Sequence, residues 1–126
     1  MSEVVSSLMQ RQVRTIDMDD TVAEVEGMFA RERLSWAPVT TRGGEVIGVI
    51  SAADVLQLHA SGRDAAAIRA WQLCTYKPIT VAPDTTLDEL ARLMTTMGIH
   101  HVVVNDVEKI AGVVSSLDFV RTFIAE

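Results

Sequence analysis

One phrase occurs twice in this chain, and the repetition limits the possible folds more than any other feature. Residues 48–54 read GVISAAD, and residues 112–118 read GVVSSLD. With Thr15 set against Thr80, the match extends over nearly all of the 126 residues: TIDMDDTVAEVEGMF faces TVAPDTTLDELARLM, and LSWAPVT faces IHHVVVN. A duplication of this length predicts two copies of one structural unit.

Each copy begins with the same predicted elements. A short extended piece, at 13–16 and 79–81, leads into a helix whose first residues have Thr-x-x-Glu spacing, at Thr21 and Thr86. This spacing is typical of a capping box, in which the threonine accepts a backbone N–H and the glutamate reaches back. Apolar residues then recur three and four positions apart, which predicts one buried helix stripe in each copy: Val22, Val25 and Met28, matched by Leu87, Leu90 and Leu93.

Two nearly continuous apolar strands follow in each copy, at 36–40 with 45–50 and at 101–104 with 109–114. Gly43-Gly44 and Asn105-Asp106 predict the hairpin turns between them. A final helix follows each Ser-x-x-Asp, at 52–59 and 116–125. The order of strands and helices predicts a mixed α+β protein with two β-α-β-β-α repeats, residues 1–62 and 63–126. Because one such unit exposes too much apolar surface to stand alone, we expect the two repeats to pack sheet to sheet around a pseudo-twofold axis.

Charge and composition exclude several classes of protein. The net charge of −6 without a basic stripe argues against a nucleic-acid partner. No apolar run approaches the ~18 residues that cross a bilayer, and no signal-peptide pattern is present, so we expect no membrane partner. The single cysteine, Cys74, allows no internal disulfide and fits the cytoplasm. No nucleophile–base pair or phosphate-binding glycine loop is found, so we expect no enzymatic activity.

The repeated Ser-x-x-Asp admits two interpretations, and they are compatible with each other. A serine at the N-cap and an aspartate three residues later satisfy free N–H groups and complement the helix dipole without any ligand. The same geometry suits a nucleotide, because N–H groups at a helix N-terminus favour phosphate. A nearby carboxylate can accept both ribose hydroxyls.

These motifs together resemble a tandem pair of CBS domains, also called a Bateman module. The resemblance rests on the helix starts 19–24 and 84–89, on the middle strands 37–39 and 102–104, and on the doubled Gly-h-h-Ser-x-x-Asp. It implies a regulatory module, without a cofactor, that binds AMP, ADP, ATP or S-adenosylmethionine. It also implies a homodimer that signals by conformational change to a partner protein, which the sequence does not identify. The alternative is a ligand-free module for dimerisation or protein interaction.

The resemblance further implies two ligand-binding clefts, each combining residues of both copies. Asp54 and Asp118 would each hold a ribose, with apolar strand residues enclosing the adenine. The Asp118 cleft would also contain Ser115, Val113, Val13, Arg14, Leu34 and Ser35. The Asp54 cleft would also contain Ser51, Val49, Pro78, Ile79, Ile99, His100 and His101.

The two clefts differ in their expected cations. His100 and His101 occupy positions where the family places basic residues, and adjacent strand residues face opposite sides, so only one imidazole can point inward. That imidazole would bind phosphate; otherwise one ring is exposed and the other packs in the interior. The first copy has Trp36 instead, which leaves Arg14 as its cation unless Arg14 is merely solvated. We therefore expect stronger binding in the Asp54 cleft, and no metal site, because adjacent histidines diverge.

Overall fold

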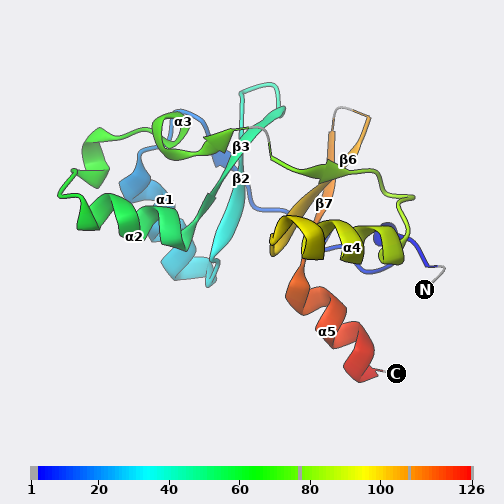
Figure 1. Cartoon of the computed structure of the whole chain (residues 1–126). Coiled ribbons are helices and arrows are strands. Elements are labelled where there is room, and N and C mark those ends of the chain that lie inside the picture. Colours follow the sequence, from blue (N-terminus) through cyan, green and yellow to red (C-terminus); the bar gives the residue numbers. More distant parts are fainter. Residues whose placement is uncertain (1–2, 77, 108, 126) are drawn as a thin grey trace. The chain divides into compact units, whose positions relative to one another are not determined.

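The computed structural model describes residues 3–76, 78–107 and 109–125, which form two compact units. The first unit spans residues 14–78, and the second combines residues 1–13 with residues 79–126 (Figure 1). Each unit has its own sheet and its own apolar core. Within the described ranges, every helix is too short or too polar to span a lipid bilayer.

The first unit is a four-stranded mixed sheet covered by helices. Its strands lie in the order β1-β2-β3-β4, with β1 parallel to β2 and the other pairs antiparallel. The helices α1 and α2 pack side by side (Figure 1). In chain order the elements are β1 (Ile16–Asp17), α1 (Val22–Glu32), β2 (Trp36–Thr40), β3 (Val46–Ser51), α2 (Ala52–Ala60), the 3-10 helix η2 (Ala65–Ala67), α3 (Ala70–Leu73) and β4 (Thr75–Tyr76).

The second unit repeats this plan with one strand fewer. Its sheet has the order β5-β6-β7, with β5 parallel to β6 and β6 antiparallel to β7. Its elements are the 3-10 helix η1 (Val5–Ser7), β5 (Thr80–Val81), α4 (Leu87–Met97), β6 (His101–Asp106), β7 (Lys109–Ser115) and α5 (Ser116–Ala125). The mixed α+β class and the two-repeat order of elements predicted from the duplication are therefore confirmed.

The predicted helix stripes form much of each core. Val22, Val25 and Met28 of α1 are buried, and so are Leu87 and Leu90 of α4. The prediction for Leu93 was wrong in part, because this side chain is only half-buried. Met94, the next residue along α4, is 6% exposed and fills the core at that level.

The predicted capping boxes at Thr21 and Thr86 are formed only in part. Thr21 Oγ1 accepts from the Glu24 N–H at 3.1 Å, and Thr86 Oγ1 accepts from the Glu89 N–H at 3.2 Å. The Glu24 carboxylate accepts from the Thr21 hydroxyl rather than from its backbone N–H. Half of the motif is sufficient to start α1, because the cap satisfies one free N–H group.

The first predicted turn is confirmed, and the second lies further along the chain. Gly44 follows β2 with φ +87°, a conformation that favours glycine. In the second unit, Asn105 and Asp106 are still part of β6 and pair with Ile110 and Lys109. The prediction of a turn at Asn105-Asp106 was therefore wrong. Val107, with φ 53°, leaves the strand instead.

Each unit is completed by a short segment that precedes the other repeat in sequence. Residues 3–10 bond to the second unit: the Leu87 N–H donates to Glu3 O at 2.9 Å, and the Val5 N–H donates to Thr85 O at 2.8 Å. Residues 68–75 bond to the first unit in the same way, with Val22 donating to Ile68 and Ala70 to Asp20, both at 2.8 Å. These compact units are not the same as the sequence repeats, so the repeat bounds 1–62 and 63–126 stay a prediction.

Candidate functional site

The end of β3 and the start of α2 form a complete capping box around Ser51 and Asp54. Ser51 Oγ accepts from the Asp54 N–H at 3.2 Å. Oδ2 of Asp54 accepts from the Ser51 N–H at 2.8 Å and from the Ser51 hydroxyl at 3.0 Å. Asp54 is half-buried. The capping interpretation of Ser-x-x-Asp is thus confirmed here, and the box leaves the second carboxylate oxygen outside it.

The second unit reproduces this box where β7 meets α5. Oδ2 of Asp118 accepts from the Ser115 N–H at 2.7 Å and from the Ser115 hydroxyl at 3.2 Å. Ser115 Oγ accepts from the Asp118 N–H at 3.3 Å. Asp118 is nevertheless more enclosed than Asp54, with only 6% of the residue exposed. The duplication therefore extends to single hydrogen bonds within the box.

Oδ1 of Asp118 has a further partner that no local sequence pattern indicates. The side-chain amide of Gln10 donates to it from Nε2 at 2.9 Å. An Arg121 guanidinium nitrogen lies 3.9 Å from the same oxygen. Gln10 precedes the aligned part of the repeat, so only its position 65 residues before Thr75, the spacing that relates Thr15 to Thr80, could have drawn attention to it.

The backbone brings the residue before each middle strand beside the box of its own unit. The Ala52 N–H donates to Ser35 O at 2.8 Å, and the Ser116 N–H donates to His100 O at 3.0 Å. The predicted clefts instead combine residues of different units. Their assembly, and the roles of Val13, Pro78, Ile79, Val49 and Val113 in them, stay predictions.

The two imidazoles of the second unit have different surroundings. His100 is exposed and, with Met94, Thr95, Gly98, Ile99 and Ser116, lines a cavity of about 300 Å³. His101 is half-buried in β6, and burial lowers the pKa of its imidazole; His100 adds to this effect, and Asp118 partly opposes it. The two neighbouring rings thus differ in exposure, but His100 precedes β6, so the expected alternation along a strand does not apply to it.

The predicted site residues of the first unit differ in their exposure and partners. Arg14 pairs with Glu32, with its Nε 2.7 Å and 2.9 Å from the two carboxylate oxygens, although its side chain is 57% exposed. Leu34 is half-buried against the core, and Ser35 is exposed.

Cys74 is buried, and this burial raises the pKa of its thiol. Among the described residues, no cluster of three or more His, Cys, Asp or Glu could hold a metal ion.

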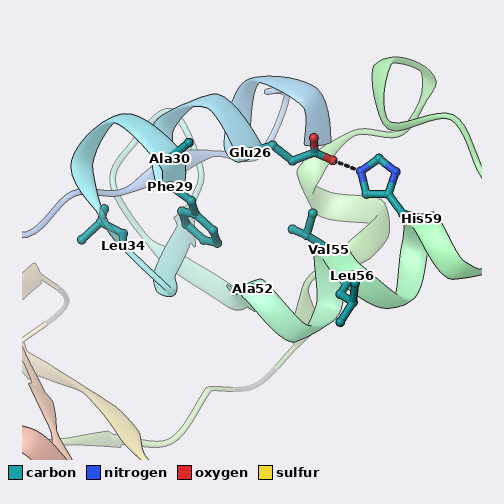
Figure 2. Close-up of a pocket in the computed structure, with 8 residues that line it drawn as sticks. All are labelled: Glu26, Phe29, Ala30, Leu34, Ala52, Val55, Leu56 and His59. Atoms are coloured by element: carbon teal, nitrogen blue, oxygen red, sulfur yellow. Dashed lines mark hydrogen bonds and ion pairs between the residues drawn. The ribbon is translucent and has the colours of Figure 1, made fainter.

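A second feature of the first unit is a groove of about 430 Å³ between α1 and α2 (Figure 2). The buried side chains of Phe29 and Val55 line it together with Leu56, which is 70% exposed. His59 Nε2 and a carboxylate oxygen of Glu26 are hydrogen-bonded at one end (Figure 2). No sequence pattern indicates this groove, because the exposure of Leu56 depends on how α1 and α2 pack.

Comparisons with known proteins match both repeats. A family model described as CBS domain matches residues 5–61 and 70–125. The CBS domain pair of protein MJ0100, in complex with 5′-methylthioadenosine and S-adenosyl-L-methionine, has 21% identity, a TM-score of 0.88, and coverage of 99% of this chain and 98% of that one. A protein with CBS domains from Burkholderia ambifaria has 24% identity, a TM-score of 0.89, and coverage of 98% of this chain and 96% of that one. CBSX2 in complex with AMP has 21% identity, a TM-score of 0.87, and coverage of 97% and 96%.

No curated protein matches this chain by sequence. The structural likenesses lie below 25% identity, so they establish the fold and not the ligand. The fold expected from the resemblance is therefore confirmed. Which residues would contact a ligand has to be argued from the geometry of the two boxes described above.

Proposed function

Because the chain belongs to the CBS-domain family, we propose that it is a regulatory module that binds an adenosine-containing ligand. The observation that carries this proposal is the pair of matching boxes at Asp54 and Asp118. Each places a carboxylate in the first turn of a helix that directly follows a strand, β3 in the first unit and β7 in the second. Two neighbours with the same fold support it, since one was crystallised with S-adenosyl-L-methionine and the other with AMP.

The chemistry of the proposed site follows from the polar groups beside each box. Oδ2 of Asp54 is engaged by Ser51, so Oδ1 is the oxygen that would accept a ribose hydroxyl. The N–H groups of the first turn of α2 would favour the ligand's negative charge. In the second unit, the exposed His100 is better placed than His101 to meet a phosphate, because burial disfavours the charged form of His101.

Regulation would follow from a difference in ligand affinity between two arrangements of the protein. A ligand shifts such an equilibrium only as far as it binds one arrangement more tightly. We propose that a partner protein in the cytoplasm reads this shift, and that the chain itself performs no chemistry.

The direct test is thermal unfolding with a panel of AMP, ADP, ATP and S-adenosylmethionine, with GMP and CMP as controls. A ligand at about 100 times its dissociation constant should add about 2.7 kcal/mol to the free energy of unfolding. This corresponds to a rise of several degrees in Tm. A rise restricted to adenosyl compounds supports the proposal. No rise with any member of the panel contradicts it.

The roles of the carboxylates are tested by Asp54→Asn and Asp118→Asn. Asparagine keeps an oxygen that can accept the serine N–H, so the box and the helix start should survive. It loses the charge and one acceptor, so ligand affinity should fall about tenfold or more. Titration calorimetry of the folded variants gives the affinity. Full affinity in the double variant would exclude both residues as ribose ligands.

A second candidate function is favoured by the groove between α1 and α2. Its apolar lining and the exposed Leu56 fit an interaction surface, and we propose a second copy of this chain as the occupant. The repeat supports this choice: α5 carries Val120, 46% exposed, at the position that matches Leu56. A self-complementary surface suits a twofold dimer.

The two functions are distinguished by sedimentation with and without the panel of nucleotides. A dimer that no ligand affects, together with an unchanged Tm, would favour the ligand-free interaction module. A dimer that coexists with a ligand-dependent Tm would favour the regulatory module.

A further inference from the structure

We propose that the Gln10 side chain competes with ligand for the Asp118 carboxylate. The same ligand would then bind the Asp118 site more weakly than the Asp54 site. The inference rests on the proposed function, because it concerns the same two carboxylates. It concerns contacts within each unit and does not depend on how the units face each other.

Both oxygens of Asp118 are occupied within the second unit. Oδ2 belongs to the capping box, held by the Ser115 N–H at 2.7 Å. Oδ1 accepts from Gln10 Nε2 at 2.9 Å and lies 3.9 Å from the Arg121 guanidinium. With 6% of the residue exposed, Asp118 has little surface left for a further donor. A ribose hydroxyl that bonds Oδ1 must therefore compete with the Gln10 amide at this enclosed oxygen.

Asp54 differs at this one oxygen. Its Oδ2 is held in the same way, by the Ser51 N–H at 2.8 Å. Over residues 3–76, 78–107 and 109–125, no side chain donates a hydrogen bond to Oδ1 of Asp54. The residue is also half-buried rather than buried. The Asp54 carboxylate is therefore ready to accept a ligand hydroxyl without displacing a protein group.

Thr75 is the structural counterpart of Gln10. Gln10 forms an antiparallel bridge with Val113, five residues before Asp118, and Thr75 pairs with Val49, five residues before Asp54. A Cβ added at Gly112 would lie 2.7 Å from Gln10 O, and one added at Gly48 would lie 2.6 Å from Thr75 O. The two backbones thus approach their strands in the same register and at the same closeness.

The difference between the two sites therefore lies in side-chain length and donor chemistry. A glutamine amide extends far enough from this position to bond the carboxylate, and a threonine hydroxyl on Cβ does not. A hydrogen bond to a charged group is worth on the order of 1.5 kcal/mol or more, which corresponds to about a tenfold difference in affinity. This difference agrees in direction with the expectation that the Asp54 site binds better.

The test exchanges the two residues while one site is disabled. In an Asp54→Asn background, which leaves the Asp118 site, Gln10→Thr should tighten the binding of AMP or S-adenosylmethionine about tenfold. In an Asp118→Asn background, Thr75→Gln should weaken binding by a similar factor. Titration calorimetry measures both. Gln12→Thr is the matched control, since Gln12 is also exposed and should leave both affinities unchanged.

The outcomes separate this inference from the proposed function. Opposite changes in the two exchanges support the competition by Gln10. Binding that neither exchange alters would overturn the inference and leave the proposed function standing. Weaker binding in Gln10→Thr would also overturn it, because Gln10 would then be a ligand contact. If neither AMP nor S-adenosylmethionine binds the wild-type chain or any variant, the proposed function fails, and this inference fails with it.

Discussion

His101 lies in β6 opposite Ser115 of β7, in surroundings that oppose its protonation. Burial removes water from the imidazole and lowers its pKa below the ordinary 6.5, and the adjacent His100 acts in the same direction. Asp118 acts in the opposite direction without cancelling the effect. At this scale, burial in β6 disfavours the charged form of His101.

The lowered pKa of His101 predicts a dependence of stability on pH. Above about pH 6.5 the ring is neutral in both folded and unfolded chains, and it adds no pH dependence. Below this value the unfolded chain takes up the proton more readily, so the free energy of unfolding falls until the folded pKa is passed. Urea unfolding at about pH 7.5 and 5.5 should show this loss, and His101→Gln should reduce it.

The control for this prediction is His100→Gln, which removes the exposed neighbour. It should leave most of the pH dependence in place, because burial of His101 is the main cause of the lowered pKa. An equal loss of pH dependence in both variants would contradict the assignment to His101.

The hydrogen bond from Gln10 to Asp118 could not be predicted from the sequence, whereas the capping boxes could. The capping boxes at Ser51 and Ser115 were predictable, because each joins residues three apart. The bond from Gln10 to Asp118 joins residues 108 apart, so no local pattern indicates it. Only the tertiary approach of residues 9–10 to β7 brings this amide to the carboxylate.

The helices α1 and α4 end at equivalent residues that differ in chemistry. Arg33 follows α1 with φ 55° and ψ 45°, and Gly98 follows α4 with φ 64° and ψ 33°. Both have the left-handed conformation common after helices, which glycine adopts without strain from a Cβ. The first copy therefore has an arginine at the position where the second copy has glycine, the residue favoured in this conformation.

We predict that Arg33→Gly stabilises the protein by about 0.5–1 kcal/mol, because it relieves this strain. Gly98→Ala should destabilise it by about 1 kcal/mol for the converse reason. Urea unfolding followed by circular dichroism measures both. If Arg33→Gly lowers the stability, contacts of the arginine outweigh the backbone strain, and the prediction is wrong.

The glycines of the repeated phrase have a packing role that the sequence left unexplained. A Cβ at Gly48 would lie 2.6 Å from Thr75 O and 2.8 Å from the Cys74 sulfur. A Cβ at Gly112 would lie 2.7 Å from Gln10 O. In both units glycine allows a second backbone to approach the strand edge.

Gly48→Ala and Gly112→Ala should each lower the free energy of unfolding by about 1–3 kcal/mol, because the neighbouring backbone must move. Gly43→Ala is the control, since its nearest neighbour would be Thr41 Oγ1 at 3.7 Å, an ordinary contact. Chemical denaturation of the three variants provides the comparison. Equal stability of all three would show that the close approach relaxes without cost.

Periodicity and duplication predicted the elements well and the turns less well. The stripe at Val22 and Val25 follows from 3.6-residue spacing, which the core of the first unit uses directly. Asn105 and Asp106 have turn propensity, but cross-strand pairing with Ile110 and Lys109 extends β6 through them. Tertiary pairing overrides local propensity at such positions.

For the whole molecule, the duplication bears on assembly as well as on fold. Leu56 on α2 and Val120 on α5 occupy matching positions, and both are exposed. A chain with two similar apolar helix faces can present the same kind of surface to a second copy. Since a twofold interface uses each contact twice, a change at one residue would count twice in the proposed dimer.

This doubling gives a prediction for Leu56→Lys. Loss of one buried leucine contact is worth about 1.5–3 kcal/mol, and a lysine in the apolar groove adds the cost of desolvating its charge. The dimer should therefore dissociate at least about a hundredfold more readily, as measured by sedimentation over a range of concentrations. Gln57→Lys is the matched control, because it adds the same charge at an exposed residue of α2 outside the groove. If both variants weaken the dimer equally, the effect is one of net charge, and the groove is not the interface.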